Sequence, residues 1–380
     1  MKPLPEERRT WAEININAAE QNYKLIKNAL PQGTKLCCVV KANAYGHSAA
    51  ILAPLYESLG ADWFAVSNIH EALDLRGYGI TRPVLILGFT PPQAAPILAK
   101  NNISQCVYSL PFAEDLSREA QKNNVRVKIH IKIDSGMGRI GFKSLGKESG
   151  EFNEMLCACR LPALDTEGIF THFASADEGE SGCGYTQGQF SNFNAAIKFL
   201  EREHIKFSVR HCSNSAAITD FPAYTLDMVR AGIILYGLNP SSDIKNALPL
   251  TPVMTLKSVI SHIKNAQKGE CISYGRTFTV QKDMRIATIA AGYADGILRS
   301  CGTNGLKVLI RGHLCPVIGR ICMDQFMADI TAIPDAQIYD EVMIFGNKPA
   351  MTASEIAIIN GTINYEVVCA VGERVPRIAG

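Results

Sequence analysis

Eight short apolar runs, separated by longer stretches of helical character, constrain the fold of this chain more than any other feature. Each run has the length and the β-branched, apolar content of a buried strand. Most begin roughly 20 to 25 residues after the previous one, with two gaps of roughly 40, which is the spacing of strands and helices in a parallel, helix-covered sheet. The runs begin near Leu36, Asp62, Pro83, Ser104, Arg126, Thr166, Phe207 and Met228.

Eight such units in about 200 residues favour a closed (β/α)8 barrel over an open doubly wound sheet. The intervening segments support this prediction. Between residues 185 and 203, for example, apolar residues recur at Phe190, Phe193, Ile197 and Leu200, with polar residues between them. This period is that of an amphipathic helix with one buried face.

The sequence changes character around residues 240–252, which are rich in Pro, Ser and Asn. Beyond them, strand-like segments follow one another without helices, which predicts a β-sandwich or β-barrel. We predict a barrel domain over residues 1–248, whose first ten or so residues pack against the second domain, and a mainly β domain over 249–380. The expected strands of the second domain are 253–263, 285–291, 306–310, 316–318 and 341–345, and its one expected helix is 352–360, capped by Thr352.

Composition excludes several classes of function. The 38 basic and 36 acidic side chains give a net charge of +2, which argues against binding to nucleic acid or to an anionic membrane. The 12 cysteines are scattered, and the first 14 residues lack the apolar stretch of a secretory signal, so we predict a cytoplasmic protein without disulfides or a membrane span. Cys157 and Cys159 are too close together for a usual zinc site, so no metal is expected.

Lys41 is the first residue with a predicted chemical role. It ends the first apolar run, in VVKANAYGHS, and Asn43, Gly46 and Ser48 after it are turn residues. A partly desolvated amine can have its pKa lowered enough to bind a cofactor aldehyde as a Schiff base. On its position alone, however, a solvated lysine that caps a strand is the more common case.

Other reactive residue types recur where the predicted strands end. In a (β/α)8 barrel the active site lies at the C-terminal ends of the strands. Each residue alone is more often structural, but their convergence on one rim predicts a site. In chain order these residues are Lys41, Tyr45, Lys132, Asp134, Arg139, His172, Asn214, Ser215, Arg230, Gly232 and Ile233.

The last two strand ends suggest a phosphate site. Loops after strands 7 and 8 of such barrels often bind phosphate through backbone N–H groups. Residues 213–217 offer hydroxyls, small side chains and a helix start, and Gly232 allows the backbone to approach a ligand closely. A phosphate together with a Schiff-base lysine predicts pyridoxal 5′-phosphate. Without Lys41, an ordinary helix N-cap would explain the segment HCSNSAA better.

Seven segments, one of them in two parts, together resemble the alanine racemase family, in the family's order and over about residues 11–378. The resemblance implies a barrel with a β domain, a pyridoxal phosphate-dependent isomerase activity, and D-alanine supply for peptidoglycan. One departure is Ser48, where the family more often has glycine. The matching segments are VVKANAYGHS, IKIDSGMGRIGF, HCSNSAA with MVRAGIILYGL, ISYGRTF, GYADG, GRICMDQF and TINYE.

For cofactor binding, the resemblance implies Lys41 as the Schiff-base lysine and one of two catalytic bases. His172 would lie beside the cofactor ring, with Asn214 nearby, and Arg230 would face the pyridine nitrogen. A guanidinium group only donates hydrogen bonds, so that nitrogen would stay unprotonated and the ring would be a weaker electron sink, which disfavours transamination. Around the phosphate the resemblance places Tyr45, Ser215, Gly232, Ile233 and Tyr365.

For the substrate, the resemblance implies Arg139 at the carboxylate and at the cofactor's phenolate oxygen. Lys132 would be carbamylated to an anion that positions Arg139, since two unmodified cations would repel each other. Tyr274 would be the second base, on the opposite face of the reacting carbon. Read without the family, Tyr274 is an aromatic residue on a turn.

The second domain is implied to act in a partner copy. In the family, Tyr274, Tyr293, Met323 and Asp324 come from the other subunit, which implies a head-to-tail homodimer. Met323 would bind the substrate carboxylate through its backbone N–H, and Tyr293 would narrow the entrance.

Three alternatives remain at this point. A pyridoxal phosphate-dependent decarboxylase would favour an acidic residue at the pyridine nitrogen, where Arg230 is expected instead. A non-catalytic cofactor-binding barrel would leave the second domain and Tyr274 unexplained. A related racemase for serine, lysine or a broad range of amino acids stays open, because residue types alone do not define the volume of the substrate pocket.

Overall fold

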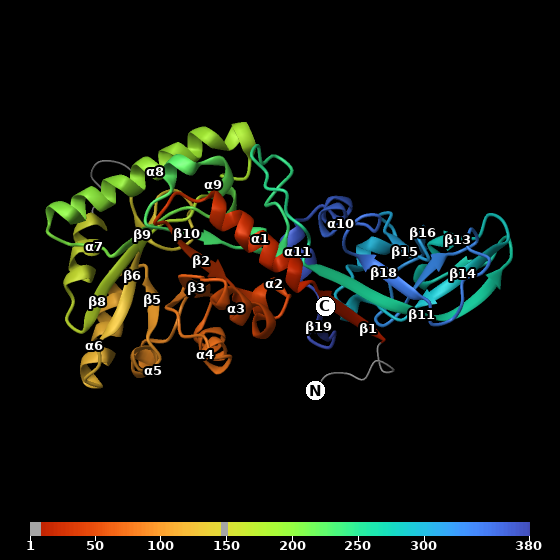
Figure 1. The fold of residues 1–380 in the computed structure, drawn as a ribbon, viewed down its shortest axis with the longest axis horizontal. Coiled ribbons are helices and arrows are strands. Elements are labelled where there is room, and N and C mark those ends of the chain that lie inside the picture. The colour runs from red at the N-terminus through yellow and green to blue at the C-terminus, as the bar shows by residue number, and fades with distance from the viewer. Residues whose placement is uncertain (1–8, 146–150) are drawn as a thin grey trace.

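The structure, a computed structural model, describes residues 9–145 and 151–380. Figure 1 shows two bodies side by side: a barrel of strands surrounded by helices, and a mainly β body that contains the blue C-terminal part of the chain. The red N-terminal strand lies with the β body rather than with the barrel.

The barrel contains all eight strands expected from the sequence. They pair in parallel and in the order β10, β2, β3, β4, β5, β6, β8, β9. Between β9 and β10, the hydrogen bonds from Asp227 N to Arg210 O (3.1 Å) and from Arg230 N to Ser213 O (3.0 Å) close the ring. The fold class is therefore confirmed. The strands are β2 (Lys35–Val39), β3 (Trp63–Val66), β4 (Val84–Ile86), β5 (Ile103–Val107), β6 (Val127–Asp134), β8 (Leu164–Phe170), β9 (Val209–His211) and β10 (Met228–Ala231), and β7 (Phe142–Lys143) pairs with β6 alone.

Amphipathic helices cover the outside of the barrel. In α8 (Gly179–Arg202), Phe193, Ile197 and Leu200 are buried and Phe190 packs partly buried against the core, as the sequence periodicity predicts. Apolar faces of this kind bury the parallel strands on their outer side. The other helices are α1 (Ile16–Ala29), α2 (Lys41–Tyr45), α3 (Ala49–Ser58), α4 (Ile69–Gly77), α5 (Ala95–Lys100), α6 (Leu110–Lys122), α7 (Glu151–Arg160) and α9 (Ser215–Asp220), with short 3-10 turns such as η4 (Ile233–Tyr236).

The β body is an antiparallel ring with two added strands. The path β14, β17, β16, β15, β18, β11 returns to β14, so six strands close on themselves, and β1 and β19 extend the sheet beside β11. Of these, β1, β17 and β19 were not expected from the sequence. The strands are β1 (Thr10–Ile14), β11 (Met254–Ala266), β14 (Met284–Ile289), β15 (Lys307–Ile310), β16 (His313–Ile318), β17 (Phe326–Asp329), β18 (Glu341–Phe345) and β19 (Arg377–Ala379).

Two helices and a hairpin complete this body. Helix α10 (Ala353–Asn360) begins at the predicted cap, because Thr352 and Glu355 each bond the other's backbone N–H. The sequence predicted one helix here, whereas the structure adds α11 (Asn364–Cys369). The hairpin of β12 (Cys271–Ile272) and β13 (Phe278–Thr279) brackets Tyr274.

The start of the described chain packs against the β body. Strand β1 runs antiparallel to β11 and parallel to β19, and Thr10 Oγ1 donates a hydrogen bond to Ala290 O at 2.6 Å. Residues 1–8, also expected to pack here, lie outside the described part of the chain. The domain boundary at residue 248 stays a prediction.

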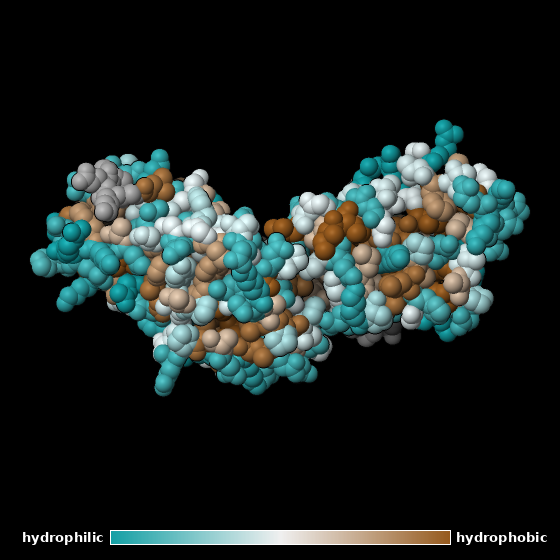
Figure 2. Space-filling view, turned by 90° about the horizontal axis from the view of Figure 1, so that it is seen from above, coloured by the Kyte–Doolittle hydropathy of each residue, from teal (hydrophilic) through white to brown (hydrophobic). Residues whose placement is uncertain are grey.

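The surface gives two further observations. Seen from above, a waist separates the two bodies, and apolar side chains gather beside it on the β body (Figure 2). Within residues 9–145 and 151–380, no helix is both long and apolar enough to cross a membrane.

Candidate active site

A cavity of about 520 Å³ opens at the C-terminal ends of the barrel strands. Ten of the predicted site residues line it, although they come from positions between 41 and 365. The structure therefore places these residues around one cavity. These residues are Lys41, Tyr45, Lys132, Arg139, His172, Asn214, Ser215, Arg230, Gly232 and Tyr365.

The cavity is electropositive. Four basic side chains line it, from Lys41, Lys132, Arg139 and Arg230, and none of its lining residues is Asp or Glu. Burial, reinforced by the charge of Arg139, lowers the pKa of Lys41 below its ordinary value. Burial and the charge of Arg230 hold the pKa of His172 well below its ordinary value, so the imidazole stays neutral. Such a cavity suits a ligand with several negative charges.

Lys41 begins an unusual turn. The next four residues, Ala42 to Tyr45, have positive φ angles of 51°, 53°, 56° and 53°, although none is glycine. The sequence predicted a tight polar turn, and the structure gives a left-handed helical turn. Gly46 ends it at φ 81°, where a Cβ would lie only 2.3 Å from Val368 O. Because the turn is compact, Lys41 and Tyr45 both reach the cavity.

One end of the cavity is a cradle of hydroxyl and backbone groups. Gly232 N donates to Ser215 Oγ at 3.0 Å, and a Cβ on Gly232 would lie 2.7 Å from the Tyr45 hydroxyl. Burial raises the pKa of Tyr45, so this hydroxyl stays protonated and can donate. The ring of Tyr365, from α11, lies 5.9 Å from that of Tyr45. This arrangement can hold a phosphate.

Asn214 and Ile233, two further predicted site residues, occupy positions that local structure explains. Asn214 Oδ1 accepts the N–H of Ala217 at 3.0 Å and so caps α9, as the simpler sequence interpretation suggested, while the residue also lines the cavity. Ile233 starts the 3-10 turn after Gly232, and its fully buried side chain is not part of the cavity lining.

Arg230 is held in the floor of the cavity by neutral groups. Its guanidinium donates to the carbonyls of Thr171 (2.8 Å) and Cys212 (3.1 Å), and Nη1 lies 2.8 Å from His211 Nδ1. Because a guanidinium only donates, His211 Nδ1 must accept. Nη2 also lies 3.4 Å from His172 Nδ1, and no carboxylate contacts this arginine among the described residues. Arg230 is therefore a donor-only cation in the cavity lining that no neighbouring carboxylate neutralises.

A chain of hydrogen bonds continues behind Arg230. His211 Nε2 lies 2.9 Å from His130 Nδ1, and His130 Nε2 lies 3.4 Å from Glu167 Oε2. With Nδ1 of His211 accepting, its Nε2 carries the proton and donates to His130, which in turn donates to Glu167. The donor and acceptor roles thus place the proton on Nε2 in both His211 and His130. Burial lowers the pKa of both imidazoles.

Lys132 lies deep in the cavity without a polar partner. Its buried Nζ makes no hydrogen bond to any described residue and lies 4.6 Å from the centre of the Phe170 ring. Burial, helped by the charge of Arg230, lowers the pKa of Lys132 to about 7. Near neutral pH this amine is therefore neutral in a large fraction of molecules.

Arg139 lies exposed at the mouth of the cavity. The loop before it is held by Asp134, the residue that ends β6, whose Oδ1 accepts the N–H groups of Gly136 and Gly138 at 3.0 Å each. The guanidinium itself makes no hydrogen bond within the described chain, so it is available to an anion.

The four predicted site residues of the second domain lie outside this cavity. Tyr274, Tyr293 and Met323 are large apolar side chains with exposed fractions of 65%, 41% and 53%, and the Asp324 side chain is 53% exposed. Their segments lie together on the β body, since Tyr293 N bonds Cys322 O (3.0 Å) and Ser273 Oγ bonds Arg320 O (2.7 Å). They form a second cluster, which we call the 274/293/323 surface.

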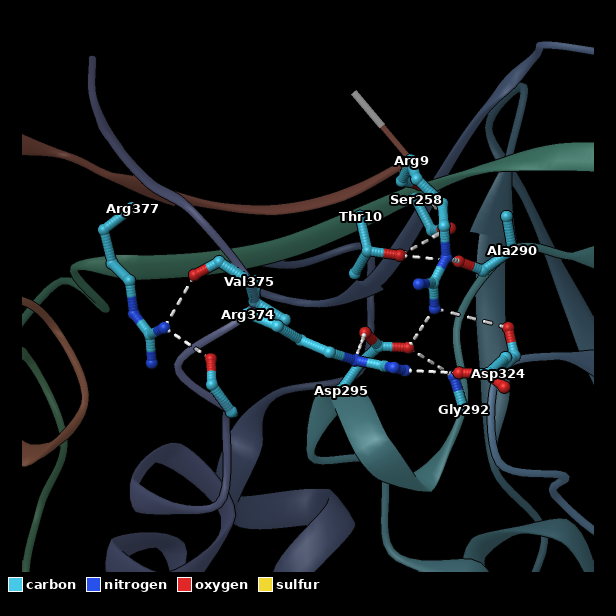
Figure 3. A network of polar contacts seen from close by, with 11 residues as sticks. Arg9, Thr10, Ser258, Ala290, Gly292, Asp295, Asp324, Arg374, Val375 and Arg377 are labelled. Carbon is cyan, nitrogen blue, oxygen red and sulfur yellow. Dashed lines mark hydrogen bonds and ion pairs between the residues drawn. The ribbon is translucent and has the colours of Figure 1, made fainter. Parts of the chain in front are cut away.

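A buried carboxylate supports this surface from behind (Figure 3). Asp295, which is 1% exposed, receives Arg374 Nε on one oxygen at 2.8 Å, and Arg9 Nη2 and Gly292 N on the other at 2.5 and 2.8 Å. Arg374 also donates to Asp324 Oδ1 at 2.7 Å. The ion pairs thereby join the Tyr293 turn, the segment of Met323 and both ends of the described chain.

Several site residues were missed by the sequence reasoning. His211 opens the segment HCSNSAA, and His130 lies in the apolar run that begins near Arg126, but neither was predicted to have a role. An alternation of polar residues in HIKID was the available signal for His130. Cys369 and Phe170 also line the cavity, and no local pattern distinguishes either from a packing residue.

The ends of the barrel strands bring together the desolvated Lys41, the donor-only Arg230 and the cradle of hydroxyl and backbone groups at Gly232. Together these features define a pyridoxal phosphate-dependent enzyme. The family models named "Alanine racemase, N-terminal domain" and "Alanine racemase, C-terminal domain" match residues 14–240 and 253–379. The chain belongs to the alanine racemase family, whose cofactor is pyridoxal phosphate.

Known proteins resemble it over nearly the whole length. The alanine racemase of Desulfovibrio desulfuricans is 45% identical over 372 residues, or 98% of each chain. The structure of alanine racemase from Clostridium difficile has a TM-score of 0.93 at 44% identity and covers 98% of this chain and 96% of its own. That from Bacillus anthracis, with bound L-Ala-P, has a TM-score of 0.92 at 36% identity, with coverages of 99% and 96%.

Proposed function

We propose that this chain interconverts L-alanine and D-alanine with pyridoxal phosphate. The observation that carries the proposal is a cavity with four basic side chains and no acidic one, in which Lys41 is desolvated. The fit of the cofactor is supported by the cradle at Gly232, which leaves no room for a Cβ, and by the donor-only Arg230. When bound, pyridoxal phosphate withdraws electrons from the α-carbon of an amino acid and makes its hydrogen acidic.

The residues that would hold the cofactor follow from their positions. Lys41 Nζ would bind it covalently. Tyr45, Ser215 and the backbone at Gly232 and Ile233 would hold the phosphate, together with Tyr365. His172 and Asn214 would flank the ring, and Arg230 would donate to the pyridine nitrogen.

Racemisation needs a proton removed from one face and one returned to the other. Lys41, with its lowered pKa, can exchange a proton on its own face. We propose Tyr274 as the base on the opposite face. Within one protomer Tyr274 is not part of the cavity lining, so the proposal requires a second copy of the chain.

A head-to-tail homodimer would complete the site. The 274/293/323 surface exposes large apolar side chains on one protomer, as expected of a surface that another chain covers. Residues 1–248, together with Tyr365 from α11, would then supply the barrel site, and the 274/293/323 surface within residues 249–380 would supply the groups for the partner. In that arrangement the Met323 N–H and Arg139 would bind the substrate carboxylate, while Tyr293 and Asp324 would border the entrance.

The biological role would be D-alanine supply for peptidoglycan, in the cytoplasm. The range of substrates remains to be measured, since a serine, lysine or broad-spectrum racemase would use the same cofactor and catalytic residues.

A racemisation assay across L-alanine, L-serine, L-lysine and L-arginine tests the proposal. We expect rapid formation of D-alanine, slower or absent turnover of the others, and no release of carbon dioxide. In heavy water, Tyr274→Phe should slow removal of the α-hydrogen from one enantiomer of alanine by at least about a hundredfold, and from the other much less. Equal losses for both enantiomers, or decarboxylation, would contradict the proposal.

A further inference from the structure

The turn from Ala42 to Tyr45 is strained, and something must hold it in place. Left-handed conformation costs L-residues about 1–2 kcal/mol each, and four successive residues adopt it here. The strain lies between two residues that line the cavity, Lys41 and Tyr45. If the turn relaxed, the backbone that aims the Lys41 side chain would move with it.

Glu71 holds the first half of this turn. It lies half-buried in the first turn of α4, and its two carboxylate oxygens accept different backbone groups. Oε1 accepts the N–H of Ala42 and Oε2 accepts the N–H of Ser67, both at 2.7 Å. The carboxylate therefore bridges the residue directly after Lys41 to the residue that follows β3.

The second half of the turn has different supports. Asn43 Oδ1 accepts the N–H of Ala49 at 2.8 Å, which closes the turn onto α3. Arg377 Nε donates to Gly46 O at 2.8 Å, and its other nitrogens donate to the carbonyls of Val371, Gly372 and Val375. Figure 3 shows Arg377 reaching to Val375 in the C-terminal segment. The backbone bond from Ala44 N to Val40 O (2.8 Å) also spans Lys41, but among the described residues Glu71 is the side chain that bonds the backbone directly beside it.

We propose that Glu71 is a positioning residue for the reaction: by bridging Ala42 and Ser67, it fixes the left-handed turn and so the direction of Lys41. The inference rests on the proposed function in one respect, namely that Lys41 is the residue that binds the cofactor. Glu71 touches neither the cavity contents nor the substrate, since it is not part of the cavity lining.

Glu71 also carries a charge that acts on Lys41. The effect of this charge on the pKa of Lys41 must be separated from the effect of the hydrogen-bonded bridge on the turn. The carboxylate raises the pKa of Lys41, in opposition to burial and to Arg139. Asp74 offers a matched control. It lies on the same helix and lines the same outer hollow as Glu71, but its carboxylate accepts no hydrogen bond from any described residue.

Three variants separate the two effects. Glu71→Gln loses the charge and the bridge, because an amide has one acceptor oxygen and its NH2 would face a backbone N–H. Glu71→Asp keeps the charge but is one methylene too short to reach both N–H groups. Asp74→Asn removes a carboxylate from the same helix and the same hollow and keeps the bridge. Since Glu71 is half-buried and near the surface, all three chains are expected to fold.

The measurements use the holoenzyme with L-alanine. For Glu71→Gln and Glu71→Asp we expect kcat to fall about tenfold to a hundredfold with KM changed less than about twofold, because the substrate carboxylate groups are untouched. Backbone amides of residues 42–48 should exchange with deuterium faster. Asp74→Asn should match the wild type in both measurements.

Two results would overturn the inference. One is wild-type kcat and exchange in Glu71→Asp, and the other is a loss in Asp74→Asn as large as in Glu71→Gln, which would assign the effect to charge alone. A separate measurement tests the underlying function. Borohydride treatment of the wild-type holoenzyme, followed by peptide mass analysis, should place the cofactor's mass on Lys41, and labelling of another residue would refute the proposed function whatever the variants do.

Discussion

Lys132 is the buried lysine of the cavity lining whose amine has no hydrogen-bond partner among the described residues. A buried ammonium without a partner is costly, and here it would lie among other cations. The neutral amine can instead attack carbon dioxide, forming an N–C bond and releasing one proton, to give a carbamate anion. That anion would balance Arg139 and Arg230 in a cavity whose lining otherwise holds no negative side chain.

The extent of carbamylation should rise with pH. The folded-state pKa of Lys132 is lowered to about 7, so the reactive neutral amine increases from a minor to the major form between about pH 6 and 8. At a constant concentration of dissolved ¹³C-labelled carbon dioxide, the carbamate carbon signal in the NMR spectrum should grow over this range. Lys132→Ala should remove the signal, whereas Lys128→Ala, which removes a partly exposed lysine on the same strand, should not. A signal that survives in Lys132→Ala would contradict the assignment.

Among the helices and strands, the sequence predicted the elements that local sequence alone is enough to specify. The eight barrel strands are apolar runs between turn residues, and α10 carries its cap in Thr352 and Glu355. Strand β1 is different, since its five residues form a strand only because β11, some 240 residues later, pairs with them. Helix α11 is a six-residue segment, too short for a periodic pattern to reveal.

The left-handed turn after Lys41 is a second structure that local sequence does not predict, here within the site. Its sequence, KANAY, contains no glycine, and alanine favours a right-handed helix. Glu71 and Arg377, which bond the backbone at Ala42 and Gly46, lie far from the turn in sequence, and Arg377 is separated from Gly46 by 331 residues. Motif resemblance could name Lys41 and Tyr45, but the groups that orient them are visible only in three dimensions.

The Asp295 ion pairs give a prediction about how the 274/293/323 surface keeps its shape. Arg374→Gln should raise KM for L-alanine several-fold and lower the free energy of unfolding by about 1–2 kcal/mol, because buried Asp295 and exposed Asp324 each lose a charged donor. Steady-state kinetics and urea unfolding measure the two effects.

Arg311→Gln is the matched control for this substitution. Its side chain is 42% exposed, against 41% for Arg374, and it too pairs with two carboxylates of the β body. Both of those carboxylates are at least partly exposed, so its loss should cost about 0–1 kcal/mol and leave KM unchanged. An equal change of KM in the two variants would show that Arg374 does not support the 274/293/323 surface.

For the whole molecule, both ends of the described chain lie in the β body. Strands β1 and β19 pair in parallel beside β11, and Arg9 and Arg374 meet at Asp295. Along the chain, the barrel segment therefore lies between two segments that both fold into the β body, which also carries Tyr274. In addition, α11 extends from the β body to the cavity of its own barrel through Tyr365. The β body thus contributes Tyr365 to the cavity of its own chain, while under the proposed dimer the 274/293/323 surface would serve another copy.

Mixing two inactive variants tests whether that copy completes the site. Lys41→Ala lacks one base and Tyr274→Phe the other, so each homodimer should be nearly inactive. A mixed dimer has one site in which both bases are substituted and one site in which both are native. If subunits exchange freely, about half the dimers are mixed and half their sites are native, so activity should recover to about a quarter of the wild-type value. If Lys41 and Tyr274 acted within one chain, no native site could form and mixing would restore nothing.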